Sequence, residues 1–569
     1  MLMGTKITMQ GGRSIAALHS AFCKGISMVA LALALLSAAT FPLAATAAPA
    51  AAIRTFLGQR YAEPPLGPRR LAPATVKAFN ESSLDPGGST KVTGTKGSAC
   101  TQSSGGAEDC LFANIYAPLD SLPADAGGRG TAAPVPVFFW IHGGGWTAGS
   151  GNDYDGTVLA SGQGIVVVCI NYRLGGLGFF ASEQIAAAPG SLNATGGMNG
   201  ILDMVVALQW AQKNVHRFGG DPSQLTIAGE SAGAEAVCNL LVSPVAKGLF
   251  RRAIIESGPC ITGLHGWGPH SGVPDPNDDS APEGYLAVSE KLAQHITGEQ
   301  QPTLADLRAV QDARAFINST SIKDSIDNYV IPTNPIEYFR DGRLNAMEVM
   351  LGGNSFDGLE TYYIKYMQNP LTHMMPHSVY ESRMLKAWGP NTAAVQAVYP
   401  VERFGGNTNP ADVMPNGDAS VICPTLEIAA LITQAGGTAF SFHFQYGPVC
   451  SDVAGKMKTG PHWASHASEL AWVWGYEPAC YRNASEVALT TLMQDYWGSF
   501  TRTGQPQASL SARSSAAAVW LPWTAERGNT MVLDLNASGE VAHLKEADCQ
   551  QLHAINASFW PTGRRQGLP

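Results

Sequence analysis

A serine between two glycines is the first feature of the sequence that could carry out chemistry. Ser231 lies in the pentapeptide 229–233, which reads Gly-Glu-Ser-Ala-Gly and follows the apolar run Leu-Thr-Ile-Ala. A serine hydroxyl is a poor nucleophile near neutral pH, so it needs a base close by. The glycines permit a sharp strand-to-helix turn that presents the hydroxyl, although an ordinary Gly/Ser turn has the same letters.

A run of glycines upstream matches the second requirement of acyl transfer, which is a set of backbone amides that hold a negatively charged oxygen. Residues 142–146 read His-Gly-Gly-Gly-Trp and follow the apolar run 135–141. A phosphate-binding loop would continue into Lys-Ser or Lys-Thr, and this run does not. We therefore expect the amides of Gly144, Gly145 and Ala232 to form an oxyanion hole.

The elements that must position these residues alternate along the chain between short apolar runs and longer stretches of helical periodicity. Such continuous apolar runs suit strands of a sheet that is covered on both faces, so the pattern predicts a doubly wound α/β fold. Long mixed segments at 285–343 and 369–424 are expected to cover the active face as lids. The expected strands are 135–141, 165–171, 224–228, 253–256, 349–352 and 439–445, with a helix at 201–218.

Composition limits the class of protein. Hydrophobic residues make up 45% of the 569 residues and charged residues only 14%, which is a globular composition. Lysine and arginine total 36 against 45 acidic residues, so no basic surface for nucleic acid is expected. The Pro/Gly-rich stretches do not separate two self-contained halves. We expect one domain over 48–569.

The first 47 residues differ from the rest. Lys6, Arg13 and Lys24 precede an apolar stretch, and small residues ending Ala-Thr-Ala-Ala follow it. This pattern predicts a secretory signal peptide over 1–47 with cleavage near Ala47, and hence a secreted or periplasmic protein. The alternative is a membrane anchor, because about 18 apolar residues just span a bilayer. No stable membrane insertion is expected after cleavage.

Ten cysteines suit an oxidising compartment, and nine remain if Cys23 leaves with the leader, so at least one thiol is free. Cys169 lies in an apolar run and Cys238 follows the serine motif, and both are interpreted as buried core thiols. Cys100 and Cys110 flank a short Gly/Ser loop that a disulfide could close.

Together these motifs resemble the type B carboxylesterase family of α/β hydrolases, which includes cholinesterases and fungal lipases. The resemblance runs from about Phe56 to Trp560 and implies an α/β-hydrolase fold, a serine carboxylesterase activity and no cofactor. No metal-ligand spacing is present either. The segments that carry the resemblance are 61–67 (Tyr-Ala-Glu-Pro-Pro-Leu-Gly), 108–111 (Glu-Asp-Cys-Leu), the glycine run, 171–173 (Asn-Tyr-Arg), 218–222 (Phe-Gly-Gly-Asp-Pro), the serine motif, 496–497 (Tyr-Trp) and 503–504 (Thr-Gly).

The resemblance supplies the partners of the serine. Asp357 stands in Gly-Gly-Asn-Ser-Phe-Asp-Gly, where the family most often has glutamate as the triad acid, and Glu360 is a rival three residues on. His466 begins His-Ala-Ser-Glu, which matches the family's general base, and His462 is its competitor. The implied order of serine, acid and histidine is the order of the α/β-hydrolase fold.

Further roles follow from the same resemblance. Glu230, Ser257 and Glu469 would form a buried layer of polar residues around the triad, although ordinary helix and strand polarity explains them equally well. Two disulfides are implied, Cys100 with Cys110 and Cys423 with Cys549. The partners of Cys260, Cys450 and Cys480 stay open.

The substrate is narrowed by one departure from the cholinesterases. In those enzymes the loop between the first two cysteines is long and carries a tryptophan that binds a quaternary ammonium group. Here the loop 101–109 is short and holds no aromatic residue, which favours broad or bulky carboxylic esters, including polymeric ones. Two alternatives remain: a catalytically inactive binding or adhesion protein of this fold, and an amide or carbamate hydrolase using the same triad. The oligomeric state is left open.

Overall fold

The fold is described from a computed structural model of the chain. It describes residues 51–79, 92–124, 133–187, 197–258, 260, 265–266, 285–317, 324–327, 329–358, 374–447, 464–475, 483–509, 519–535 and 538–555. The described residues from 51 onward belong to one compact unit. Several predictions fall outside the described residues: the signal peptide and its cleavage site, Glu360, His462, Cys450 and Cys480.

A mixed sheet forms the centre of the described chain. Eleven of its strands are described, in the order β13-β12-β11-β10-β7-β6-β4-β5-β3-β1-β2. The run from β5 through β12 is parallel throughout. The pairs β5–β3, β3–β1 and β12–β13 are antiparallel, and β1 pairs parallel with β2. The strands are β1 Ile53–Arg60, β2 Val92–Thr93, β3 Phe112–Pro118, β4 Val135–Ile141, β5 Val166–Ile170, β6 Gly220–Glu230, β7 Arg252–Glu256, β10 Glu348–Asn354, β11 Thr438–Phe444, β12 Thr530–Leu533 and β13 Gly539–Val541.

The six predicted strands are all confirmed, as β4, β5, β6, β7, β10 and β11, with ends that differ by up to four residues. The strands that the sequence did not indicate lie mainly at the two edges of the sheet. In β1 the apolar pattern is interrupted by Arg54, which is buried and lies 5.4 Å from the ring centre of Phe56. β12 has only four residues, too few to show a period.

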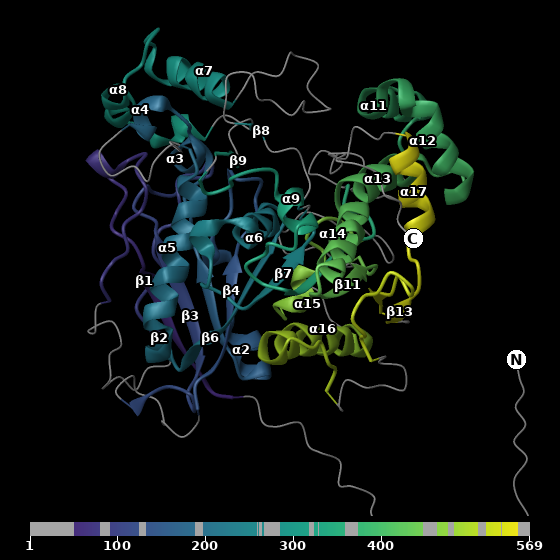
Figure 1. Cartoon of the computed structure of the whole chain (residues 1–569), viewed down its shortest axis with the longest axis horizontal. Coiled ribbons are helices and arrows are strands. Elements are labelled where there is room, and N and C mark those ends of the chain that lie inside the picture. The colour runs from purple at the N-terminus through teal and green to yellow at the C-terminus, as the bar shows by residue number, and fades with distance from the viewer. Residues whose placement is uncertain are drawn as a thin grey trace, which may run out of the picture. The chain divides into compact units, whose positions relative to one another are not determined.

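Helices cover both faces of the sheet. Along β4, Val137, Phe139 and Ile141 face one core and Phe138 and Trp140 face the other, as the two-residue period of a strand requires. The first core contains residues of α5 (Asn199–Asn214) and α6 (Ala232–Val242), and the second contains residues of α2 (Thr157–Gln163), α15 (Leu470–Val473) and α16 (Ala484–Thr503). This is the predicted α/β architecture, and Figure 1 shows its layers.

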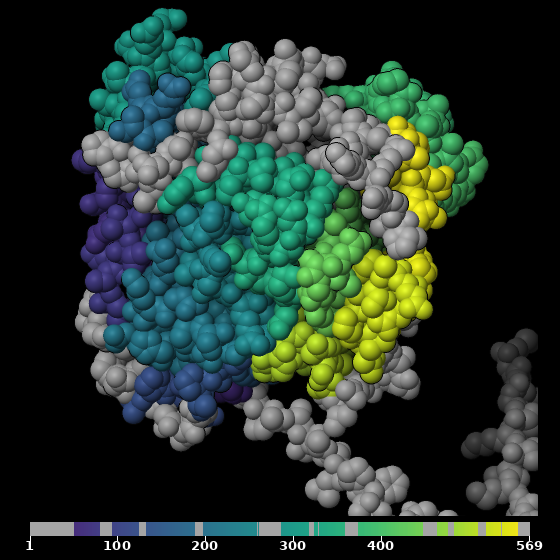
Figure 2. Space-filling view, in the orientation of Figure 1, coloured from purple at the N-terminus to yellow at the C-terminus, as the bar shows by residue number. Residues whose placement is uncertain are grey.

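The space-filling view follows the strand order. Figure 2 shows the purple N-terminal strands on one side and the yellow C-terminal elements on the other, because β1 and β2 form one edge of the sheet and β12 and β13 the other. The helix predicted at 201–218 is α5 followed by a 3-10 turn, Val215–Phe218, and it ends where Gly219 adopts a φ of 77°.

The two predicted lid segments are mainly helical in their described parts, although the first also contains the short strand β9 (Ser325–Ile326). The first contains α7 (Tyr285–Thr297), α8 (Leu304–Ala309) and α9 (Pro335–Arg340). The second contains α11 (His377–Trp388), α12 (Thr392–Val398), α13 (Thr408–Gly417) and the start of α14 (Cys423–Gln434). In Figure 1, α7 and α8 lie on one side of the upper end of the view, and α11 and α12 on the other. Their role as lids stays a prediction.

Three disulfides join described cysteines, and one of them corrects a prediction. Cys100–Cys110 and Cys423–Cys549 are the implied pairs. Cys238 is not a free thiol, because it bonds to Cys260. The prediction failed because apolar neighbours are common to a buried thiol and a buried disulfide, and only the packing of α6 beside β7 brings the two cysteines together. Cys169 is the one free cysteine among the described residues and is buried.

A short C-terminal helix, α17 (Glu546–Ile555), is held by the Cys423–Cys549 bond to α14. Among the described helices, none combines the length and the apolar character that a bilayer crossing needs.

Candidate active site

Ser231 sits at the sharp turn that the pentapeptide predicted. β6 ends at Glu230, α6 begins at Ala232, and Ser231 between them has φ 56° and ψ −128°. A non-glycine residue with positive φ is strained, so the surrounding structure must hold it. Two backbone hydrogen bonds do so: the Ser231 amide donates to the carbonyl of Glu256 at 2.9 Å, and its carbonyl accepts from the amide of Glu235 at 2.9 Å.

The glycine run approaches the serine closely at Gly143. A Cβ built on Gly143 would lie 3.0 Å from Cβ of Ser231 and 2.8 Å from Oε2 of Glu230, so a side chain cannot be accommodated here. Gly144 and Gly145 follow with φ of 110° and 59° and are exposed. Within the described part of the chain their amides donate no hydrogen bond, and they are available to a bound oxygen.

Asp357 and His466 are brought together by the structure although 109 residues separate them. Nδ1 of His466 lies 2.7 Å from Oδ1 of Asp357. The carboxylate is buried, and its Oδ2 accepts from the Ser257 hydroxyl at 2.9 Å and from the Asn354 amide at 2.5 Å. The acid is therefore fixed in orientation, and Nδ1 of the imidazole is the nitrogen that faces it.

Backbone contacts explain how the two segments meet. β10 ends at Asn354, and the turn that carries Asp357 bonds to the segment before His466: the Phe356 amide donates to the carbonyl of Ala464 at 2.8 Å. Phe356 also forms a bridge with Ser465. Because parallel strands end at the same edge of the sheet, β6 and β10 place the serine and the acid on one side.

Comparison with known proteins identifies the scaffold. The model described as "Carboxylesterase family" matches residues 44–552. The chain belongs to the carboxylesterase family.

Two relatives and one solved structure illustrate how similar this carboxylesterase is to known proteins. "Fatty acyl-CoA hydrolase precursor, medium chain" of Anas platyrhynchos is 30% identical over 483 residues, which cover 80% of this chain and 81% of the relative. Carboxylesterase 1E of Mus musculus is 29% identical over 494 residues, covering 80% and 82%. A structure of PNB esterase has the same fold, with a TM-score of 0.67 at 22% identity over 88% of this chain and 96% of that one. The protein is a carboxylic ester hydrolase.

The electrostatics of this carboxylesterase's site are set by buried acids around one imidazole. Nε2 of His466 lies 3.2 Å from Oε1 of Glu230. Burial alone would lower the pKa of His466, but the carboxylates of Glu230 and Asp357 outweigh it and raise that pKa to about 10. Burial raises the pKa of Glu230 to about 7, although the attraction of His466 opposes the rise.

Asn354 is a residue that the sequence analysis missed. Its amide group donates to the Ser257 hydroxyl at 3.1 Å and to Oε2 of Glu469 at 2.5 Å. It thereby joins two of the predicted polar residues to each other and, through its backbone amide, to Asp357. The signal lay in the segment 352–358, where Asn354 stands three residues before Asp357.

Glu256 is a second missed residue. Its backbone carbonyl holds the Ser231 amide, and its side-chain Oε1 accepts from the indole of Trp497 at 2.8 Å. Burial raises its pKa well above the usual range, and Glu469 adds to the rise. The pKa of Glu469 is itself raised to about 8, by burial first and then by Glu230. Glu256 is adjacent to Ser257 in the sequence, but nothing in the letters says that its side chain is buried.

Two further observations bound the chemistry. In this structure, which describes both residues, the hydroxyl of Ser231 forms no hydrogen bond with the ring of His466. Among the described residues there is no group of three or more histidine, cysteine or acidic side chains arranged to hold a metal ion. The described site therefore brings together a serine hydroxyl, an imidazole, a buried carboxylate and backbone amides that donate no hydrogen bond among the described residues.

Proposed function

We propose that this carboxylesterase cleaves carboxylic esters through an acyl-enzyme formed on Ser231. His466 takes the proton of the serine hydroxyl, the oxygen attacks the ester carbonyl, and the amides of Gly144, Gly145 and Ala232 hold the oxyanion. His466 then protonates the leaving alcohol, and water cleaves the acyl-enzyme by the same route in reverse. Asp357 orients the imidazole and stabilises its protonated form.

The observation that carries this proposal is the 2.7 Å contact between His466 and Asp357 on the same side of the sheet as the strained turn of Ser231. Catalytic hydrogen bonds are often long before substrate binds, so the missing serine–histidine bond is compatible with this role. The serine hydroxyl would compete for Nε2 with Oε1 of Glu230, which lies 3.2 Å from that nitrogen.

For the substrate we propose broad or bulky esters. Two observations support this: the short loop between Cys100 and Cys110 without aromatic residues, and the exposure of Gly144 and Gly145. The relative named for fatty acyl-CoA hydrolysis makes medium-chain thioesters a reasonable addition to the substrates tested. Rates that fall steeply with either acyl or alcohol size would contradict the proposal.

Export is part of the same proposal. A signal peptide over 1–47 fits the three disulfides of the described chain and the precursor form named for one relative. It would leave one domain over 48–569, secreted or periplasmic. Mass spectrometry of the mature N-terminus tests this, because an intact Met1 would contradict export by this route.

The deciding experiment is a panel of short and long acyl esters, aryl esters, polyesters and acyl-CoA thioesters, run on the wild type and on Ser231→Ala. The variant should lose activity on every substrate that the wild type cleaves, with the same melting temperature. Activity that persists in Ser231→Ala would overturn the mechanism. A folded wild type that is inactive on the whole panel would favour a binding protein instead.

A further inference from the structure

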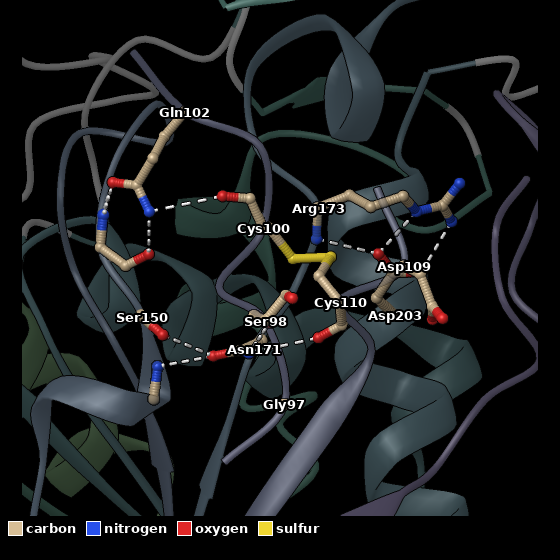
Figure 3. Close-up of a disulfide and its surroundings, with 12 residues drawn as sticks. Gly97, Ser98, Cys100, Gln102, Asp109, Cys110, Ser150, Asn171, Arg173 and Asp203 are labelled. Carbon is tan, nitrogen blue, oxygen red and sulfur yellow. Dashed lines mark hydrogen bonds and ion pairs between the residues drawn. A yellow bond between two sulfur atoms is a disulfide. The ribbon is translucent and has the colours of Figure 1, made fainter. Parts of the chain in front are cut away.

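The end of the glycine loop lies against the turn closed by the Cys100–Cys110 disulfide, and Figure 3 shows this junction. Gln102 lies in that turn and uses both ends of its amide group. Its Nε2 donates to the carbonyl of Gly149 at 3.1 Å, and its Oε1 accepts from the Gly149 amide at 3.1 Å. This pair of bonds fixes the place and the orientation of the two peptide units that flank Gly149.

Gly149 in turn packs against the residues that begin the glycine run. Its φ is 99°, and a Cβ built on it would collide with the carbonyl of Gly143 and with the ring of His142, at 2.6 Å from Nδ1. Two carbonyl–amide bonds close the loop between them, since Gly144 accepts from the amides of Thr147 and Ala148. A shift of Gly149 would therefore be passed to Gly143 and Gly144 by direct contact.

A second amide side chain ties the same junction together. Asn171 accepts from the Ser150 hydroxyl at 2.9 Å and from the Gly151 amide at 2.8 Å. Its Nδ2 donates to the carbonyls of Ser98 at 3.0 Å and Cys110 at 3.2 Å, at the two ends of the disulfide turn. Figure 3 shows these bonds beside those of Gln102.

The turn is itself a firm support. Beyond the disulfide, Gln102 and Gly105 exchange backbone bonds across it at 2.8 and 3.0 Å. Glu108 makes a two-bond ion pair with Arg70, and its side chain is only 12% exposed. A rigid support can transmit position, which a mobile surface loop could not do.

We infer that Gln102 is a positioning residue of the oxyanion hole: it holds the glycine loop, through Gly149, at the place where its amides meet the reacting oxygen. The inference rests on the proposed function, because it assigns the amides of Gly144 and Gly145 to the oxyanion. It makes the disulfide turn a part of the catalytic apparatus that touches no reacting atom.

Gln102→Met tests the inference, because methionine keeps the length of the side chain and removes both hydrogen bonds with Gly149, together with the longer one from Nε2 to the carbonyl of Cys100 at 3.4 Å. Misplacing oxyanion donors costs rate more than ground-state binding, so kcat should fall by about 10- to 100-fold with KM changed by less than about threefold. A trifluoromethyl ketone, whose serine adduct carries an oxyanion, should lose affinity by the same factor as kcat/KM. Active-site titration corrects each rate for the fraction of competent enzyme.

Gln212→Met is the matched control. Its Nε2 also donates to two backbone carbonyls, those of Pro222 and Leu249 at 2.8 Å each, and it belongs to α5. Its kcat should stay within about twofold of the wild type, as expected for a surface-adjacent change outside the site. If Gln102→Met does not fold, Gln102→Glu is measured instead, because it keeps the shape and replaces the donor to Gly149 by an acceptor.

The outcomes separate the two proposals. A Gln102 variant whose titrated sites keep wild-type kcat and inhibitor affinity overturns the positioning role, and so does a loss confined to the titratable fraction or the melting temperature. A failure of the proposed function shows elsewhere, as activity in Ser231→Ala or a wild type that the ketone does not inhibit.

Discussion

Two buried polar clusters of the molecule differ in how completely their polar groups are paired. The acid cluster (Glu230, Glu256, Asp357 and Glu469) gathers four buried carboxyl groups. Those of Glu230, Asp357 and Glu469 act on the imidazole of His466, and that of Glu256 interacts with Glu469 and Glu230. One oxygen each of Glu256 and Glu469 is buried without a hydrogen bond among the described residues, and Oε1 of Glu230 has only its 3.2 Å contact with Nε2 of His466. Such a cluster stores unfavourable electrostatic energy, which is typical of sites where pKa values are tuned for chemistry.

The scaffold cluster (Asn171, Arg173 and Asp203) lies beside the first disulfide and is fully satisfied. Arg173 donates to Asp203 through Nε at 2.8 Å and Nη2 at 2.6 Å, and through Nη1 to the carbonyl of Ala72 at 2.8 Å. The charges balance, and Asn171 uses all four of its hydrogen-bonding positions. Buried polar groups are stable only where each has a partner. The same carboxyl-to-amide substitution should therefore affect activity in the acid cluster and stability in the scaffold cluster.

The largest effect is expected at the acid that contacts the imidazole. Asp357→Asn keeps the shape but removes the charge that orients His466, so kcat should fall by about 10³- to 10⁴-fold. The measurement is kcat on an aryl ester, corrected by active-site titration. Glu360→Gln is the control and should keep wild-type activity; the reverse result would reassign the acid.

A carboxyl-to-amide change in the scaffold cluster should act on stability instead. Asp203→Asn would set an amide N–H₂ against the guanidinium of Arg173 and leave a buried charge unpaired, which costs about 3–5 kcal/mol of unfolding free energy. Urea unfolding measures it. Asp312→Asn, in an exposed pair with Arg314, should leave the midpoint unchanged. A stable Asp203→Asn would mean that the cluster does not depend on charge pairing.

A charge removed beside Nε2 should move the pH dependence. Because the pKa of His466 is raised and the base must be neutral, the acidic limb of kcat/KM should lie above the usual imidazole range in the wild type. Glu230→Gln lowers that pKa, so the limb should move to lower pH by about 1–2 units. A limb that stays in place, seen in a pH–rate profile, would show that Glu230 does not act on His466.

The smallest effect is expected when the carboxyl group of Glu256 is changed to an amide. Burial raises the pKa of this side chain well above its usual range and so favours its uncharged form, and glutamine keeps an oxygen for the indole of Trp497. Glu256→Gln should change the unfolding free energy by less than about 1 kcal/mol, against the large cost at Asp203. Two similar costs in parallel urea titrations would remove the distinction between the clusters.

Much of the fold could be predicted from local pattern. Each predicted strand was confirmed because continuous apolar runs are needed wherever a parallel strand is covered on both faces. Strands toward the two ends of the sheet show this pattern less clearly: β1 carries the buried Arg54, and β12 is too short to recognise. The Cys238–Cys260 bond was missed because a disulfide depends on the distance between two segments, which composition does not contain.

The sequence by itself determined which chemical groups the site contains. Local pattern indicated the glycine-flanked Ser231 and the glycine run, and the family resemblance indicated Asp357 and His466. Only the tertiary structure decided how those groups are tuned. It placed Glu230 3.2 Å from the imidazole, buried Glu256 against Trp497, and set Gln102 on Gly149. The physical reason is that a turn depends on neighbouring residues, whereas burial, charge coupling and support depend on segments that meet only when the sheet is assembled.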